Sequence, residues 1–255
     1  MRKTLSVAII TRNEEANLDR TLGSVAWADE IVVVDSGSND RTEEIARSYR
    51  SRFFVEEWQG FAAQKNSALE KCSCDWILSL DADEALSDEL AKEIWGLLER
   101  DPPFDGYALP RRNLFLGRWM RFGGFYPDPK LRLFRRGAAE FEARPVHETL
   151  HFPGKAGHLK GDMVHYAYPS LEAYIAHMDR YSGLGAEQVV REGGRRLHPW
   201  MFGVNVVLNP IGTFVYNYFF RLGFLDGREG LLLHLYHSVY VSWKYAKAWE
   251  QGRSR

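Results

Sequence analysis

Four short apolar runs, separated by segments with helical spacing, occupy the first hundred residues of the chain. The runs are Leu5–Ile10, Ile31–Val34, Phe53–Val55 and Trp76–Leu80. Wholly apolar runs are typical of parallel strands that are covered on both faces of a sheet. Alternation of such strands with helices favours a parallel sheet with right-handed crossovers. We therefore predict a doubly covered α/β fold for this part of the chain.

Polar residues mark the expected beginnings of the helices between these strands. Asn13 can cap a first helix that carries Glu14 and Glu15 in its first turn, and Ser87 can cap a later one. A further helix is predicted for Phe61–Leu69 from its composition and spacing. The helices are thus expected between the strands, where crossover connections need them.

The pattern changes after Pro102, where strands of an antiparallel or mixed extension are expected. A long helix is predicted from Ser170 to about Glu192, and no internal repeat interrupts the chain. The predicted strands are Tyr107–Leu109, Lys130–Arg135 and Glu140–His147.

Charge and cysteine content narrow the classes of function. The chain has 255 residues and a formal net charge of -1, so its overall charge gives no reason to expect a nucleic-acid partner. Cys72 and Cys74 are separated by one residue, which suits neither a disulfide framework nor a closed zinc site. This spacing favours a reducing cytosol. The basic start followed by Leu5–Ile10 imitates a signal peptide, but the apolar stretch is too short, and a buried first strand is favoured.

Three of the predicted strands end in polar residues that suggest a ligand site. These ends are Thr11-Arg12-Asn13-Glu14, Asp35-Ser36-Gly37-Ser38 and Asp81-Ala82-Asp83. Ligands of open parallel sheets bind outside the carboxyl ends of the strands. A single acidic strand end is commonly a turn or cap residue, but three on one edge favour a site.

The sequence also lacks two common phosphate-binding loops. Neither G-x-G-x-x-G after the first strand nor G-x-x-x-x-G-K-[ST] is present, which disfavours a dinucleotide dehydrogenase and a P-loop enzyme. A diphosphate can instead be held through a divalent cation, which takes one or two carboxylates from the protein. Asp81 and Asp83 meet that requirement after the fourth strand.

Four blocks of the sequence resemble family-2 glycosyltransferases with the GT-A fold, and they occur in the order found in that family. Later stretches, YPDPKLRLFR at residues 126–135 and Val146-His147-Glu148, resemble the non-processive branch that builds lipopolysaccharide cores. The sequence lacks the Q-x-x-R-W signature of processive synthases, which favours transfer of a single sugar. The four blocks are LSVAIITRNEE (5–15), IVVVDSGSNDRT (31–42), GFAAQKNSAL (60–69) and WILSLDADE (76–84).

The resemblance implies a fold and a division of the chain. It implies a Rossmann-like, mostly parallel sheet with helices on both faces, a mixed-sheet acceptor part and a C-terminal helical segment. Residues 1–100 would bind the nucleotide sugar, residues 101–195 would form the acceptor and catalytic part, and residues 196–255 would form an amphipathic helical segment.

The resemblance also implies roles for individual residues of the nucleotide-sugar site. Lys65 stands where the family often has Arg, so a two-pronged contact there is less expected. By this resemblance, the nucleotide base would be bordered by Thr11, Asn13 and Glu14, and its uracil imide would donate to Asp35. Lys65 would contact ribose or phosphate, Asp81 would lie near the ribose, and Asp83 would bind Mg²⁺ or Mn²⁺.

Three further roles have alternatives that the sequence leaves open. An inverting transfer needs a carboxylate base, for which Glu148 is the first candidate, Asp128 the second and Asp162 the third. His165 is either a late metal ligand or a core or rim residue. Arg132 is either on the polar face of a strand or in contact with a phosphate of the donor or acceptor.

The C-terminal part contains a long uncharged stretch. Met201–Phe220 has no charged residue, but it contains Pro210 and a stripe of polar residues, and aromatic and basic residues surround it. This composition favours a position in the headgroup region of an anionic membrane over a membrane span. Packing of ordinary helices on the catalytic domain or on a second subunit is the alternative. The polar stripe is formed by Asn205, Asn209, Thr213 and Asn217.

Taken together, these patterns predict an inverting, metal-dependent glycosyltransferase. It would move one sugar, from a UDP-hexose, to a lipid-linked saccharide at the cytoplasmic face of the inner membrane, without a nucleic-acid partner. Transfer to a polyprenyl phosphate is the nearest alternative. A sugar-phosphate nucleotidyltransferase and a non-catalytic scaffold are less favoured.

Overall fold

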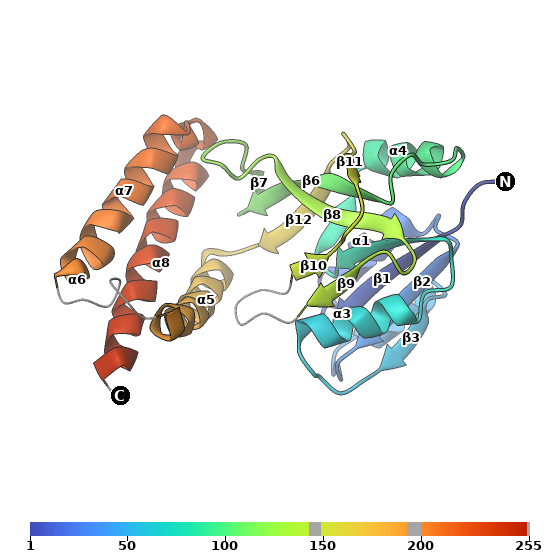
Figure 1. Ribbon diagram of the computed structural model, residues 1–255, viewed down its shortest axis with the longest axis horizontal. Helices are drawn as coiled ribbons and strands as arrows, with labels where there is room; N and C mark the ends of the chain where they lie inside the picture. The colour runs from blue at the N-terminus through green and yellow to red at the C-terminus, as the bar shows by residue number, and fades with distance from the viewer. Residues whose placement is uncertain (143–148, 193–199, 254–255) are drawn as a thin grey trace. The chain divides into compact units, whose positions relative to one another are not determined.

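The computed structural model describes residues 1–142, 149–192 and 200–253 (Figure 1). The chain forms two compact units. The first contains Met1–Arg112 and Asp128–Tyr166, and the second contains Asn113–Pro127 and Ala167–Arg255. The second unit is therefore discontinuous in sequence, because its first piece is inserted between two segments of the first unit.

The first unit contains the predicted parallel strands. β1 (Leu5–Thr11) pairs in parallel with both β2 (Glu30–Asp35) and β4 (Trp76–Asp81), and β2 pairs in parallel with β3 (Arg52–Val55). The strand order is β3-β2-β1-β4, so the carboxyl ends of these strands share one edge. The predicted parallel sheet is thus confirmed.

Antiparallel strands extend this sheet beyond β4, as predicted. β8 (Asp128–Arg135) runs antiparallel to β4 and to β6 (Gly106–Phe115). Of the strand predicted at Glu140–His147, Glu140–Glu142 forms β9, and the remaining residues lie outside the described ranges. The other strands are β5 (Glu84–Leu86), β7 (Arg118–Trp119), β10 (Thr149–His151), β11 (Ala156–His158) and β12 (Met163–Tyr168).

Helices cover both faces of the parallel strands because successive strand side chains point to opposite faces. In β1, Val7 and Ile9 pack with apolar side chains of three helices on one face. Ala8 packs with the fourth helix on the other face. The three helices are α1 (Leu18–Val25), α2 (Thr42–Ser48) and α4 (Asp88–Leu98), and the fourth is α3 (Phe61–Glu70).

One of the two predicted helix caps is wrong. Asn13 lies four residues before the N-cap position of α1, in a left-handed conformation with φ of 56°, and its side chain accepts a hydrogen bond from the backbone of Asn39 at 2.9 Å. It therefore joins two loops instead of capping a helix. Ser87 caps α4 as predicted, because its hydroxyl accepts from Leu90 N at 3.2 Å.

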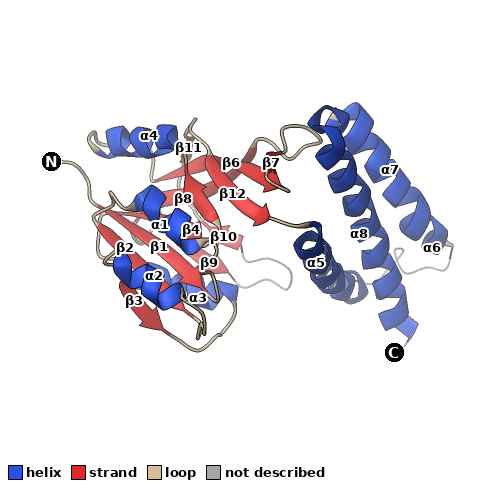
Figure 2. Ribbon diagram, turned by 180° about the vertical axis from the view of Figure 1, so that it is seen from behind, coloured by secondary structure: helices blue, strands red, loops and turns tan. Residues whose placement is uncertain are grey.

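The second unit is mainly helical (Figure 2). α5 (Leu171–Glu192) confirms the predicted long helix and packs against α8 (Gly227–Arg253), with α7 alongside α8. In the described ranges, no helix is both long and apolar enough to cross a membrane. The run before α8 consists of α6 (Met201–Gly203), the π-helical turn η2 (Val204–Leu208), α7 (Asn209–Val215), the π-helical turn η3 (Tyr216–Phe220) and the 3-10 turn η4 (Gly223–Asp226).

A buried histidine of α8, His234, packs against the loop Arg121–Phe125. His234 is buried, and neither ring nitrogen has a hydrogen-bond partner among the described residues. A Cβ added to Gly123 would lie 2.0 Å from its ring, and one added to Gly223 would lie 2.2 Å from it. The close approach of His234 therefore requires glycine at both positions. Burial, with a smaller contribution from His237, lowers the pKa of His234 to about 4.

We predict that the second unit loses stability in mild acid because of this histidine. The unfolded chain binds a proton near the ordinary histidine pKa, while the folded state resists it until about pH 4. Stability is therefore present above about pH 6.5 and falls as the pH drops toward 4, by about 2 kcal/mol at pH 5. His234→Leu should flatten this dependence in urea denaturation at pH 7.5 and pH 5, whereas His158→Leu, at an exposed position, should retain it. If His234→Leu lost as much stability between pH 7.5 and pH 5 as the parent protein, His234 would not be the source of the pH dependence.

Candidate active site

The loops after β1 and β2 are joined through the carboxylate of Asp35. This buried group accepts hydrogen bonds from the Thr11 hydroxyl at 2.8 Å and from the backbone N–H groups of Gly37 and Ser38 at 2.9 and 2.7 Å. The Ser38 hydroxyl donates a fourth bond at 2.5 Å. An ionised carboxylate has about four accepting positions. All four bonds of Asp35 thus lie within the two loops and set their shape.

The same loops are linked further by Asn13 and Glu14, two residues predicted to border the base. Asn13 N donates to the Ser38 hydroxyl at 2.7 Å, and Glu14 N donates to the Thr42 hydroxyl at 2.8 Å. Burial raises the pKa of Glu14, the hydrogen bond from Asn17 opposes this rise, and the negative charges of neighbouring aspartates, including Asp83, add to it. A cation near Glu14 would relieve this repulsion.

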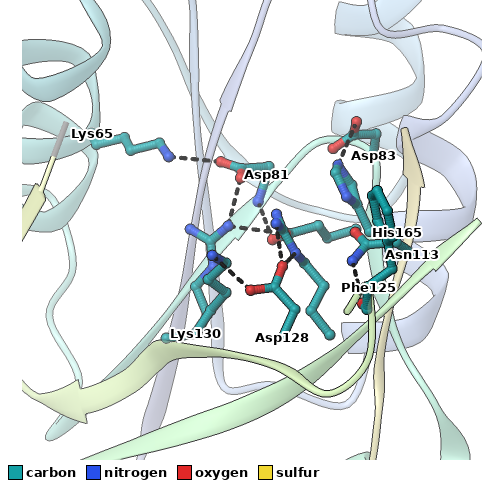
Figure 3. A network of polar contacts seen from close by, with 11 residues as sticks. Lys65, Asp81, Asp83, Asn113, Phe125, Asp128, Lys130 and His165 are labelled. Carbon is teal, nitrogen blue, oxygen red and sulfur yellow. Dashed lines mark hydrogen bonds and ion pairs between the residues drawn. The ribbon is translucent and has the colours of Figure 1, made fainter. Parts of the chain in front are cut away.

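Two cations converge on the first aspartate of the D-x-D triplet (Figure 3). Lys65 Nζ lies 2.8 Å from Asp81 Oδ1, and Arg132 Nη2 lies 2.6 Å from Asp81 Oδ2. The Arg132 guanidinium also donates to Glu84 Oε1 at 2.8 Å, and Asp81 N donates to Glu84 Oε2 at 3.1 Å. Although burial raises the pKa of Asp81, Arg132 and Lys65 together hold it well below its usual range. These four side chains therefore form a charged network.

Asp128, the second candidate base, belongs to the same network. Arg111 donates to Asp128 Oδ2 through Nη2 at 2.6 Å and Nε at 3.0 Å, while Lys130 Nζ lies 2.9 Å from Asp128 Oδ1. Burial raises the pKa of Asp128, but Arg111 and Lys130 together outweigh burial, so the pKa is lowered. Asp128 is thus an ionised group held by two cations, which weakens it as a proton acceptor.

Asp83 and His165 form a separate polar pair. His165 Nε2 lies 3.2 Å from Asp83 Oδ2, and both side chains retain partial exposure (Figure 3). No set of three or more His, Cys, Asp or Glu side chains with metal-binding geometry occurs among the described residues. Adjacent ligands of an octahedral Mg²⁺ lie about 3 Å apart, and the ion usually takes most other ligands from water and phosphate. The pair therefore fits two neighbouring positions of such an ion.

Most of the predicted nucleotide-sugar and metal residues contact one another in the structure, but not every candidate base joins them. Asp162, the third candidate base, forms an ion pair with Arg112. Glu148 lies outside the described residues. The groups that form are Thr11 with Asp35, Asn13 and Glu14 with the second loop, Lys65 with Asp81 and Arg132, and Asp83 with His165.

Two members of the network, Glu84 and Arg111, were not predicted from the sequence. Glu84 is 0% exposed and lies 3.6 Å from Arg111 Nη1. A signal for Glu84 was present, because it directly follows the D-x-D triplet at the end of a buried strand. Arg111 gave no such signal, since its partners depend on the pairing of β6 with β8.

Comparison with known proteins identifies the family. Residues 6–151 match the sequence profile described as "Glycosyl transferase family 2". The chain belongs to glycosyltransferase family 2. The lipopolysaccharide core biosynthesis glycosyltransferase LpsC of Rhizobium meliloti is 35% identical over 236 residues, which cover 88% of this chain and 82% of that protein. An uncharacterized glycosyltransferase of Rickettsia bellii is 32% identical over 243 residues, covering 90% and 81% of the two chains.

Solved structures of other glycosyltransferases share the fold. The mannosyltransferase PcManGT from Pyrobaculum calidifontis, in complex with GDP-Man and Mn²⁺, matches with a TM-score of 0.55 and 17% identity, covering 97% of this chain and 87% of that one. TarS 1–349 of S. aureus in complex with UDP matches with a TM-score of 0.50 and 18% identity, covering 98% and 92%. The predicted GT-A fold is therefore confirmed, and the candidate residues Thr11, Asp35 and Asp81 end its parallel strands β1, β2 and β4.

We predict that Arg132 is the main stabilising cation of the network. Arg132→Met leaves the fully buried Glu84 without its closest cation, which should lower the free energy of unfolding by about 3–5 kcal/mol. Lys130→Met, which removes a more exposed cation, should cost less than about 1 kcal/mol. Combining Arg132→Met with Glu84→Gln should recover more than half of the loss in urea denaturation. A loss in Arg132→Met no larger than in Lys130→Met would contradict this assignment.

Proposed function

We propose that this glycosyltransferase is an inverting, metal-dependent enzyme that transfers one hexose from a UDP-sugar to a lipid-linked saccharide. The observation that carries the proposal is the convergence of Lys65 and Arg132 on Asp81 at the carboxyl edge of β4. Buried cations beside a strand end provide a place for a diphosphate. The neighbouring pair of Asp83 and His165 supplies oxygen and nitrogen ligands for Mg²⁺ or Mn²⁺.

In the proposed reaction, the acceptor hydroxyl attacks the anomeric carbon opposite the diphosphate. The bond from this carbon to the diphosphate oxygen breaks as the glycosidic bond forms, and the hydroxyl proton passes to a carboxylate. Lys65 and Arg132 supply positive charge to the departing nucleoside diphosphate. A divalent ion bound by Asp83 and His165 would neutralise the same charge. Glu148 remains the first candidate base, since Asp128 is already held by two cations.

For the donor, the resemblance of the four nucleotide-sugar blocks supports a UDP-sugar. TarS binds UDP and PcManGT binds GDP-Man in their crystal structures, so the sugar-nucleotide class has support from both. The roles proposed for Thr11, Asn13, Glu14 and Asp35 at the nucleobase fit their position in the two joined loops.

For the acceptor, we propose a lipopolysaccharide core. The relative LpsC is named for lipopolysaccharide core biosynthesis, and it is similar to this chain over most of both lengths. Such an acceptor is lipid-linked, so we also propose that the enzyme works peripherally at the cytoplasmic face of the inner membrane. A polyprenyl phosphate is the alternative acceptor. The alternative role of the uncharged, aromatic-rich stretch Met201–Phe220 is to form the interface of a homodimer.

We predict that Asp83→Ala abolishes the divalent-dependent transfer of glucose from UDP-glucose. Loss of this carboxylate removes a ligand from the ion that neutralises the leaving group. Release of UDP is measured with Mg²⁺, with Mn²⁺ and with chelator, and Asp88→Ala, at an exposed site in α4, serves as the control. If Asp83→Ala in chelator were nearly as active as the parent enzyme with metal, the metal assignment would be refuted.

We predict that Glu148→Gln lowers the transfer rate by about 10² or more and leaves the affinity for the donor nearly unchanged. Asp128→Asn should lower the rate less, because Asp128 already pairs with Arg111 and Lys130. Single-turnover rates and UDP binding are measured for both variants, with thermal melts to check folding. An active Glu148→Gln together with a folded but inactive Asp128→Asn would transfer the role of base to Asp128.

A further inference from the structure

The run Met201–Leu225 exposes large apolar side chains from Phe202 to Leu225. Leu208 is 59% exposed, Ile211 55% and Phe219 54%, and these residues recur at helical spacing with Val215 between them. Soluble proteins seldom expose apolar patches this extended without a function for them. We name this surface the apolar stripe. It consists of Leu208, Ile211, Val215, Tyr216, Phe219, Phe220, Leu222, Phe224 and Leu225.

Polar groups of the same run are satisfied within the second unit. Asn205 is buried and accepts a hydrogen bond from the Asn209 amide at 3.0 Å, and the Thr213 hydroxyl donates to Asn209 O at 2.8 Å. The Ser242 hydroxyl of α8 donates to Val206 O at 2.9 Å. Of the polar stripe that the sequence predicts, Asn205 is therefore buried. The run carries its apolar residues outward and a buried amide inward.

Arginines gather where the apolar stripe ends. Asp226 is buried and accepts from the backbone N–H groups of Arg121 and Phe122 at 3.2 and 2.9 Å, so the loop that contains Arg121 lies at this corner. Glu229, at the start of α8, pairs with Arg118 at 3.6 Å. Of the four exposed arginines in these segments, Arg118 is the one that pairs with an acidic side chain among the described residues. The arginine corner consists of Arg118, Arg121, Arg221 and Arg228.

We propose that the apolar stripe and the arginine corner together form the face by which the enzyme docks on an anionic lipid bilayer. The stripe would lie flat in the headgroup and upper acyl region, where amphipathic helices bury their apolar side. The arginines would contact anionic headgroups. The proposal rests on the peripheral location given above for the enzyme, but it does not depend on the transfer chemistry.

Charge favours a bilayer over a second copy of the chain. Residues 200–225 contain no acidic residue. If two copies docked through this run, the arginines of one copy would therefore find no negative charge on the same run of the other. A two-fold interface places the same patch of both copies in contact, whereas an anionic bilayer supplies both negative charge and an apolar layer.

The test measures vesicle flotation of the full-length protein without donor or acceptor. Vesicles of phosphatidylcholine with about one third phosphatidylglycerol provide anionic headgroups, and pure phosphatidylcholine provides the neutral comparison. The stripe variant is Leu208→Asp with Phe219→Asp, and the corner variant is Arg121→Ala with Arg228→Ala. Val55→Asp, at a 64% exposed apolar position in β3, is the matched control. Circular dichroism and thermal melts establish that each variant is folded.

We expect the parent protein and Val55→Asp to float with the anionic vesicles at low salt. The stripe variant should bind at least about 10-fold more weakly, and the corner variant should lose about fivefold per arginine on anionic vesicles only. Three results would overturn the proposal: no flotation at any salt concentration, flotation that the stripe variant leaves unchanged, or a stable dimer in solution that the stripe variant dissociates. Because the assay contains no substrate, its failure would leave the glycosyl-transfer proposal untouched.

Discussion

The guanidinium of Arg132 lies between the carboxylates of Asp81 and Glu84, and much of the first unit depends on this contact. Arg132 belongs to the antiparallel strand β8, whereas Asp81 ends the parallel strand β4. The ion pairs therefore join the two halves of the sheet at the position where a ligand would bind. Removing charges from water is costly, and only a well-paired set tolerates it. The network thus fixes the D-x-D segment while keeping two cations at the edge of the site.

The two joined loops show a second way in which charge shapes the site. Asp35 uses its carboxylate to hold the turn after β2, and the hydroxyl of Thr11 ties that turn to β1. Asp83 and His165, in contrast, retain exposure and lie at a spacing that suits two ligands of one ion. The candidate site therefore combines fully bonded carboxylates with the partly exposed pair of Asp83 and His165, for which we propose a metal ion. Such a division keeps the binding groups preorganised.

Local sequence patterns were enough to predict the four parallel strands and most helices, because apolar runs such as Trp76–Leu80 reflect burial directly. They did not predict the short strands β5, β7, β10 and β11, or β12. The patterns also brought Asp81 and Asp83 into one hypothesis, to which the family resemblance added Lys65. The shared partner of Glu84 and Asp128 could not be derived in this way, since Arg111 reaches both carboxylates only through the register of β6 and β8. The cap expected at Asn13 failed for a related reason: its side chain bonds to a loop that lies 26 residues further along the chain.

The discontinuity of the second unit has a consequence for how the protein folds. The loop around Arg121 is held by the carboxylate of Asp226, which lies 105 residues later in the chain. A contact of such long range forms slowly, because a large loop must close before it contributes any stability. During synthesis, the backbone N–H groups of Arg121 and Phe122 have left the ribosome long before their partner is made. A nascent chain that stops before Gly223–Asp226 therefore contains a complete set of parallel strands but an unanchored loop directly ahead of Asp128.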